Sequence, residues 1–82
     1  SPDLSGDEQI LIHKIVKAAD RIAAYVKCIR EESTGNREFT SAGESIAASI
    51  SAIDLPCVRY YMEHFIPSYG YTLDKISYEK EQ

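Results

Sequence analysis

Three side chains, His13, Asp20 and His64, are of the types that most often bind metals or move protons. His13 lies seven residues before Asp20, so on one helix the two would share nearly the same face but stand roughly 10 Å apart along the axis. A single ion cannot bind both, because metal–ligand bonds are about 2.0–2.2 Å long. Ligand pairs on a helix are spaced three or four residues apart. We therefore expect His13 and His64 to be partly exposed histidines without a metal.

Asp20 lies within the stretch KAADRIAAYVKC, at the edge of an apolar stripe. A carboxylate in that position must be solvated, paired or bound, because burying it bare is costly. Lys17, one turn earlier, offers a surface ion pair worth about 0.5 kcal/mol. The small side chains of Ala19, Ala23 and Ala24 instead leave room for a bulky group to approach. Two alternatives stay open from the residues alone, an ion pair with Lys17 or a place at the mouth of a concavity.

Other kinds of catalytic site find little support in this sequence. It has no G-x-S-x-G elbow and no glycine-rich phosphate loop. Cys28 and Cys57 lack metal-ligand spacing and are expected to be reduced, buried thiols. The six tyrosines could stack on a base, but we favour core residues whose hydroxyls reach water. We expect no catalytic residue in this chain.

The bulk composition restricts the class of protein. The chain has 82 residues, a net charge of −4 and a pI near 5.0, which suits one small domain or a piece of a larger one. An acidic chain without a basic run is not expected to bind nucleic acid. The sequence contains no 18-residue apolar stretch that would predict a membrane span. Together with an acidic N-terminus unlike a signal peptide, this predicts a cytoplasmic protein.

The pattern of apolar residues predicts an all-α fold that begins with a long helix. Ser5 and Glu8 form the capping box S-G-D-E, and Gly35 can end the helix in the left-handed conformation. The first helix is therefore expected from about residue 6 to about residue 33. Its inward stripe, spaced by three and four residues, is Ile12, Ile15, Ala19, Ile22, Val26 and Ile29.

Two further main helices and a short last one should follow. The second should start near Arg37, with Asn36 as a possible N-cap, and carry an apolar stripe from Phe39 to Ile53. The third should begin at Pro56, capped by Asp54 or its neighbour, and end at Ile66-Pro67. We expect its inward side chains to be Val58, Tyr61, Met62 and Phe65.

The C-terminal part is expected to be less regular. Residues 68–71 should form a loop, and Thr72 should cap a short helix from Leu73 to about Tyr78. The charged tail from Glu79 should be frayed. The predicted architecture is thus three main helices plus a short C-terminal helix.

Several stretches resemble a known family. K-A-A-D-R-I-A-A-Y-V-K-C-I-R-E, then G-N-R-E-F, Y-Y-M-E-H-F-I-P-S-Y and L-D-K-I-S, are similar to the C-terminal part of the bacterial YfbR-like HD-domain 5′-deoxynucleotidases. The resemblance spans residues 7 to about 77, although residues 40–53 share only the helical pattern. It implies that residues 1–82 are a single segment, the helical C-terminal part of an HD domain whose N-terminal metal-binding half is absent from this chain.

The same resemblance implies a role for Asp20. In the family a histidine, a histidine-aspartate pair and a later aspartate hold one divalent metal ion, and the later aspartate falls on Asp20. The other ligands would precede residue 1. The implied reaction is metal-dependent hydrolysis of deoxyribonucleoside 5′-monophosphates to nucleoside and phosphate, with Co, Mn, Mg, Ni or Zn as the divalent ion. With three ligands missing, the 82 residues alone are expected to be inactive.

A segment of this kind should expose the helix faces that pack on the missing half. Exposed apolar patches usually find a partner, so we expect a homo-oligomer or retention of the N-terminal half. The alternative is a stand-alone small helical interaction or dimerisation module without catalytic activity. That alternative predicts a core closed within this chain and an ordinary solvated Asp20.

Overall fold

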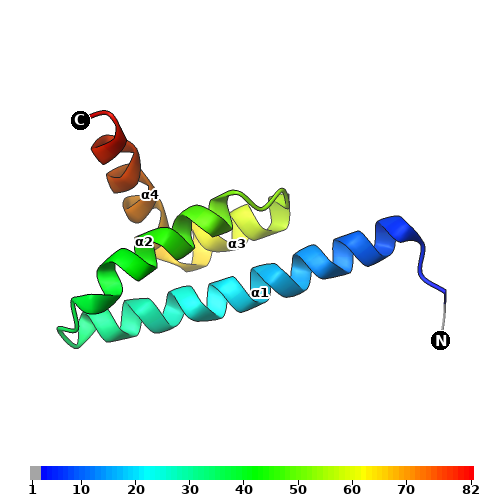
Figure 1. The fold of residues 1–82 in the computed structure, drawn as a ribbon, viewed down its shortest axis with the longest axis horizontal. Helices are drawn as coiled ribbons and strands as arrows, with labels where there is room; N and C mark the ends of the chain where they lie inside the picture. The colour runs from blue at the N-terminus through cyan, green and yellow to red at the C-terminus, as the bar shows by residue number, and fades with distance from the viewer. Residues whose placement is uncertain (1–2) are drawn as a thin grey trace.

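The computed structural model describes residues 3–82, so Ser1 and Pro2 of the predicted segment 1–82 lie outside it. Four α-helices, and no strand, occur in residues 3–82: α1 (Gly6–Ser33), α2 (Glu38–Ser51), α3 (Pro56–Phe65) and α4 (Pro67–Lys80) (Figure 1). The predicted all-α fold class is confirmed.

Both ends of α1 form as their residues predict. The Glu8 N–H donates to the Ser5 hydroxyl at 3.1 Å, and the Ser5 N–H donates to the Glu8 carboxylate at 3.3 Å. Gly35 has a φ of 90°, which a side chain with a Cβ adopts only with strain. The N–H of Gly35 donates to Glu32 O at 2.9 Å and that of Asn36 to Glu31 O at 3.1 Å. These two bonds close the helix in a Schellman motif.

The starts of α2 and α3 lie within a residue or two of their predicted positions. Arg37 occupies the N-cap position of α2, and the Asn36 side chain accepts a bond from the Glu38 N–H at 3.3 Å. Pro56 is the first residue of α3, as predicted. The N-cap there is Leu55, the neighbour of Asp54, and no side chain caps the helix.

The predicted loop at residues 68–71 is wrong, because α4 already begins at Pro67 and runs to Lys80. Pro67 ends α3 and also serves as a preorganised first residue of α4. Tyr69 is buried in the core, and this packing offsets the helical cost of Gly70, about 1 kcal/mol. Thr72 lies inside the helix and donates its hydroxyl to Ser68 O at 2.9 Å instead of capping. The helix also extends past Glu79, where fraying was expected.

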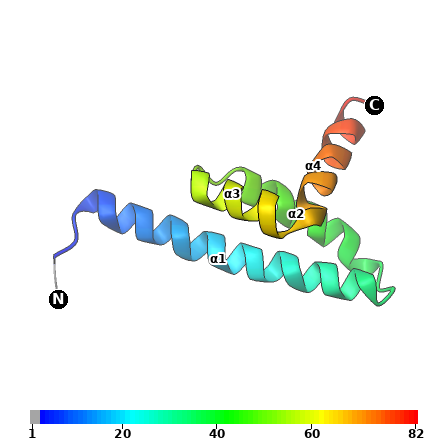
Figure 2. The same ribbon diagram turned by 180° about the vertical axis from the view of Figure 1, so that it is seen from behind.

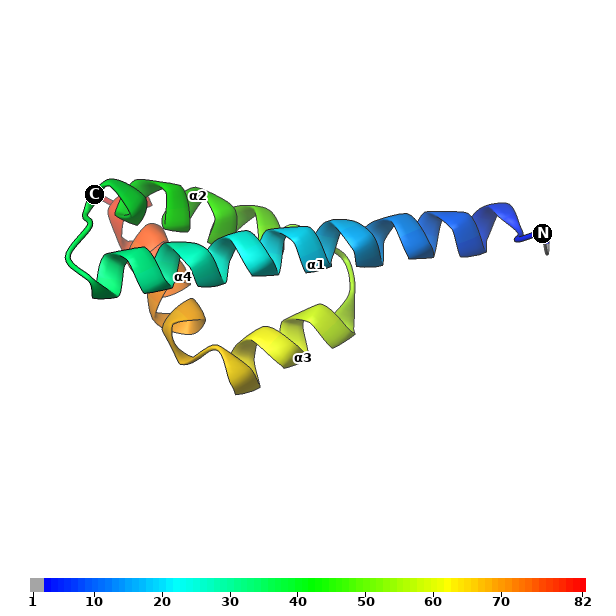
Figure 3. The same ribbon diagram turned by 90° about the horizontal axis from the view of Figure 1, so that it is seen from below.

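The other three helices lie beside the C-terminal half of α1, which packs mainly against α2. Helix α2 runs back along that half, and α3 and α4 lie on the same side of α1 as α2 (Figures 1 and 2). The N-terminal half of α1 extends alone beyond the other three helices (Figures 1 and 3). Within residues 3–82, no helix combines the length and apolarity needed to cross a membrane.

The core is small and is displaced from the predicted stripe of α1. The buried residues of α1 are Ala18, Tyr25 and Cys28, whereas Ile12, Ile15 and Ala19 of the predicted stripe are exposed. The prediction of an inward stripe is therefore wrong for the first half of α1, since none of the other helices in residues 3–82 covers that half. The buried cluster consists of Ala18, Tyr25, Ala47, Ile50, Val58, Met62 and Tyr69.

Two other burial predictions are half right. In α3, Val58 and Met62 are buried as predicted, but Tyr61 and Phe65 are exposed and stack on each other at a ring-centroid distance of 5.3 Å. Cys28 and Cys57 were both expected to be buried, and Cys57 is exposed. Its position in the first turn of α3 points it away from the side defined by Val58 and Met62.

Candidate functional site

Asp20 lies near the middle of α1 and is exposed. Its position follows from helical geometry. Ala18 and Ile22, two residues before and after it, face the core, and two residues along a helix correspond to rather more than half a turn. The carboxylate therefore points to the side of α1 opposite α2.

Neither of the two alternatives for Asp20 occurs within residues 3–82. Among residues 3–82, the ion pairs are those of Lys75 with Glu44 and Glu79, and Lys17 does not pair with Asp20. Nor does Asp20 line the cavities found over the same residues, among them an open hollow further along α1 at Ala23, Val26, Lys27, Arg30 and Glu31. Residues 3–82 by themselves leave Asp20 unpaired on an open surface, with neither the ion pair nor the concavity.

The two histidines are exposed, as predicted. The His64 ring stacks on Tyr60 at 4.0 Å, and its Nδ1 lies 2.9 Å from Tyr60 O. This contact with its own helix gives the ring an ordinary surface role.

The fit of a metal ion to this chain can be judged from its donor side chains. No group of three His, Cys, Asp or Glu side chains within residues 3–82 is placed to hold an ion. A complete metal site therefore does not fit these residues alone. Asp20 could supply one ligand, because its carboxylate is accessible and hard divalent ions favour oxygen.

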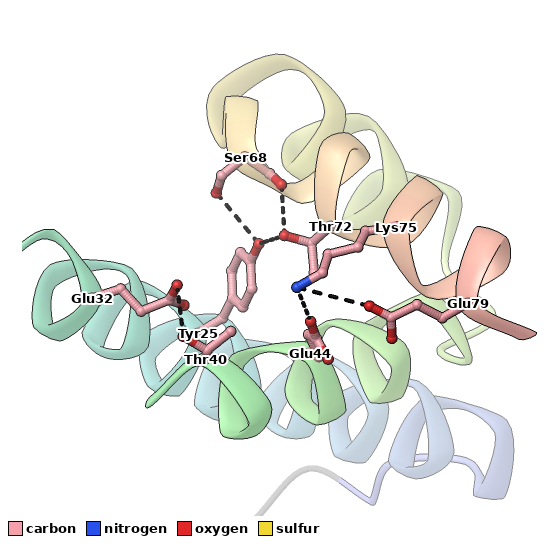
Figure 4. A network of polar contacts seen from close by, with 8 residues as sticks. All are labelled: Tyr25, Glu32, Thr40, Glu44, Ser68, Thr72, Lys75 and Glu79. Carbon is pink, nitrogen blue, oxygen red and sulfur yellow. Dashed lines mark hydrogen bonds and ion pairs between the residues drawn. The ribbon is translucent and has the colours of Figure 1, made fainter. Parts of the chain in front are cut away.

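A polar cluster that sequence reasoning missed lies between α1, α2 and α4 (Figure 4). The Tyr25 hydroxyl lies 3.1 Å from the Thr72 hydroxyl and 3.3 Å from that of Ser68. Lys75 donates to Glu44 at 2.7 Å, and this bond raises the pKa of the Lys75 ammonium. No spacing along the chain signals this cluster, because its members lie on three different helices.

The chemistry of the cluster is structural. A cavity of about 140 Å³ opens between Tyr25, Glu44 and Lys75, yet the polar side chains around it bond to one another. Glu32, for example, accepts a bond from the Thr40 hydroxyl at 3.3 Å. No buried side-chain nitrogen or oxygen among residues 3–82 lacks a partner. The cluster fixes α4 to the other helices and presents no free catalytic group.

The tyrosines divide between core and surface. Tyr25 and Tyr69 are buried and meet edge to face, with ring centroids 6.0 Å apart. Burial raises the pKa of the Tyr69 hydroxyl. The predicted role as core residues is confirmed for these two, whereas the remaining four are exposed: Tyr60, Tyr61, Tyr71 and Tyr78.

Comparison with known proteins gives one family. The model of the YfbR-like 5′-deoxynucleotidases matches residues 3–69. A 5′-deoxynucleotidase of Shewanella oneidensis is 41% identical over 63 residues, which cover 77% of this chain and 32% of the relative. One from Erwinia tasmaniensis is 42% identical over 65 residues, covering 79% of this chain and 33% of the relative. The chain thus spans about a third of the length of these relatives. No solved structure matches.

Proposed function

Because this chain belongs to the YfbR-like 5′-deoxynucleotidase family, we propose that it forms the C-terminal part of an HD-domain phosphohydrolase. The substrate class is deoxyribonucleoside 5′-monophosphates. In the reaction, water attacks the phosphorus, the bond to the nucleoside oxygen breaks, and nucleoside and phosphate are released. The family match over residues 3–69, which include Asp20, carries this proposal. The name 5′-deoxynucleotidase shared by the relatives supports the substrate class.

Asp20 is proposed to be the one metal ligand in this chain, which contributes no catalytic residue. Its exposure on the side of α1 away from the core supports this role, since a partner can reach the carboxylate there. The remaining ligands would come from an N-terminal half outside this chain. When bound, a divalent ion would supply an activated water and stabilise charge on the phosphate oxygens.

The proposed enzyme works in the cytoplasm as a homo-oligomer. Large apolar side chains exposed on the first half of α1, among them Ile10, Leu11 and Ile15, support association. The stand-alone module is not favoured. It predicts a core closed within this chain, whereas the apolar side chains on the first half of α1 are exposed. Nucleic acid is not a proposed partner, in keeping with the net charge of −4.

Function can be tested with two proteins. The first is the 82-residue chain, and the second is the Shewanella oneidensis relative with its matching third replaced by the matching residues of this chain. Phosphate release from deoxyribonucleoside 5′-monophosphates is measured with added divalent metal. We expect no turnover by the isolated chain and metal-dependent turnover by the chimera. A folded chimera that binds metal but leaves these substrates intact would refute the proposal.

A further inference from the structure

Helix α1 carries two apolar stripes, each spaced by three and four residues. The inner stripe faces α2 in the second half of the helix and consists of Leu11, Ile15, Ala18, Ile22, Tyr25 and Ile29. The outer stripe follows it one residue later and consists of Ile12, Val16, Ala19, Ala23 and Val26. Such spacing keeps a stripe on one side of a helix for its whole length and suits packing against another helix.

The outer stripe has no partner within residues 3–82. Ile12 is 47% exposed and Val16 53% exposed, Ala19 and Ala23 are also exposed, and only Val26 is half-buried. The open hollow at Ala23 and Val26 continues the same surface toward the end of α1. The two alanines leave little bulk at the centre of the stripe, so a second helix could approach closely there.

Charge argues against a second copy of this chain as the occupant. Asp20 follows Ala19 and borders the stripe at its centre. In an antiparallel pair centred on Ala19, each Asp20 would lie beside the Asp20 of the partner subunit, and a parallel pair in register would bring the same two side chains together. Two carboxylates a few ångströms apart repel each other, all the more in a partly dry interface.

We infer that the outer stripe is the contact surface for an apolar helix from the part of the enzyme that lies outside these 82 residues. The inference rests on the proposed function. It is supported by the length of the relatives, of which this chain covers only about a third. A heterologous helix can present a metal-bound or basic group to Asp20 without bringing a second Asp20 beside it. Docking there would convert the open surface around Asp20 into the edge of an interface.

The test measures thermal unfolding in the isolated chain and in the Shewanella oneidensis chimera. Ala23→Lys changes the centre of the outer stripe, and Ala23→Ser is a milder variant that should allow folding. Ala48→Lys is the matched control, because Ala48 is also an exposed helical alanine but lies on α2. All three variants should melt within about 2 °C of the parent in the isolated chain, where both positions face solvent.

In the chimera, Ala23→Lys should lower the melting temperature by at least about 5 °C, because the long side chain would block the close approach of the docked helix at this alanine. Ala23→Ser should have a smaller effect of the same sign, and Ala48→Lys almost none. An equal loss of melting temperature for Ala23→Lys and Ala48→Lys in the chimera would overturn the inference. So would a parent chimera that melts like the isolated chain, or a dimer of the isolated chain that Ala23→Lys dissociates. The melting temperature is measured without metal and without turnover. A chimera that is inactive but is still destabilised by Ala23→Lys would therefore refute only the proposed function.

Discussion

At the residue scale, Asp20 and Ala18 show how a two-residue step separates two roles. Ala18 is buried against the other helices, and the exposed Asp20 points the opposite way. The sequence alone singled out Asp20 by its alanine neighbours and by family resemblance. Its surroundings could not be predicted, because no other segment within residues 3–82 covers that side of α1.

Tyr25 offers a direct test of the polar cluster. Tyr25→Phe keeps the ring in the core but removes the bonds to Thr72 and Ser68. We expect a loss of about 1 kcal/mol in the free energy of unfolding, measured by urea titration. Tyr71→Phe is the control, because that side chain is 78% exposed and should change stability little. Equal effects of the two substitutions would contradict the contacts described for Tyr25.

The two cysteines should differ in reactivity. Burial raises the pKa of the Cys28 thiol above its ordinary value of 9.0, and nearby Glu32 acts in the same direction. At pH 8 a disulfide reagent should therefore label the exposed Cys57 much faster than Cys28. Because the folded pKa of Cys28 is raised, its contribution to stability is present below about pH 9 and is lost as the pH rises further. Equal labelling rates in the native protein would show that Cys28 is accessible.

At the scale of elements, local signals predicted the helices wherever a cap or a proline decides the boundary. The structure confirms the boundaries predicted from three local signals: the capping box that begins at Ser5, the glycine at position 35 and the proline at position 56. The last helix was misjudged, because Gly70 and Thr72 have poor helix propensity and the burial of Tyr69 depends on tertiary packing. The inward stripe of α1 was misplaced for a related reason. The apolar residues of α1 form two stripes, and their spacing alone cannot tell which one the other helices cover.

Two glycines give opposite expectations for the same substitution. Gly70 lies inside α4 with nothing within 4 Å of an added Cβ, so Gly70→Ala should stabilise the chain by up to about 1 kcal/mol. Gly35 has a φ of 90°, so Gly35→Ala should destabilise it by about 1 kcal/mol. Both changes in the free energy of unfolding can be measured by urea unfolding of the 82-residue chain. If residues 68–71 formed a loop instead, Gly70→Ala would bring no gain.

At the scale of the whole molecule, an all-α arrangement holds a small core at one end of α1 and leaves the other end uncovered. Exposed apolar side chains there include Leu4, Ile10, Leu11, Ile12, Ile15 and Val16. Fold class and family could be predicted from the sequence, since they depend on periodicity and on motifs. The candidate site could be predicted only as the single residue Asp20, because a metal site needs several ligands in three dimensions and residues 3–82 do not gather them.

The most direct test of the central claim is the metal content of the Shewanella oneidensis chimera with Asp20 and with Asp20→Asn. The amide keeps the size of the carboxylate but is a poorer ligand for a divalent ion. We expect about one ion per chain in the parent and an affinity weakened by at least the ~10–100-fold typical of changes around a metal site. Asp54→Asn, at another exposed aspartate, should keep the parent metal content, and neither substitution should lower the melting temperature of the isolated chain. Full metal occupancy in Asp20→Asn would contradict the assignment of Asp20 as a ligand.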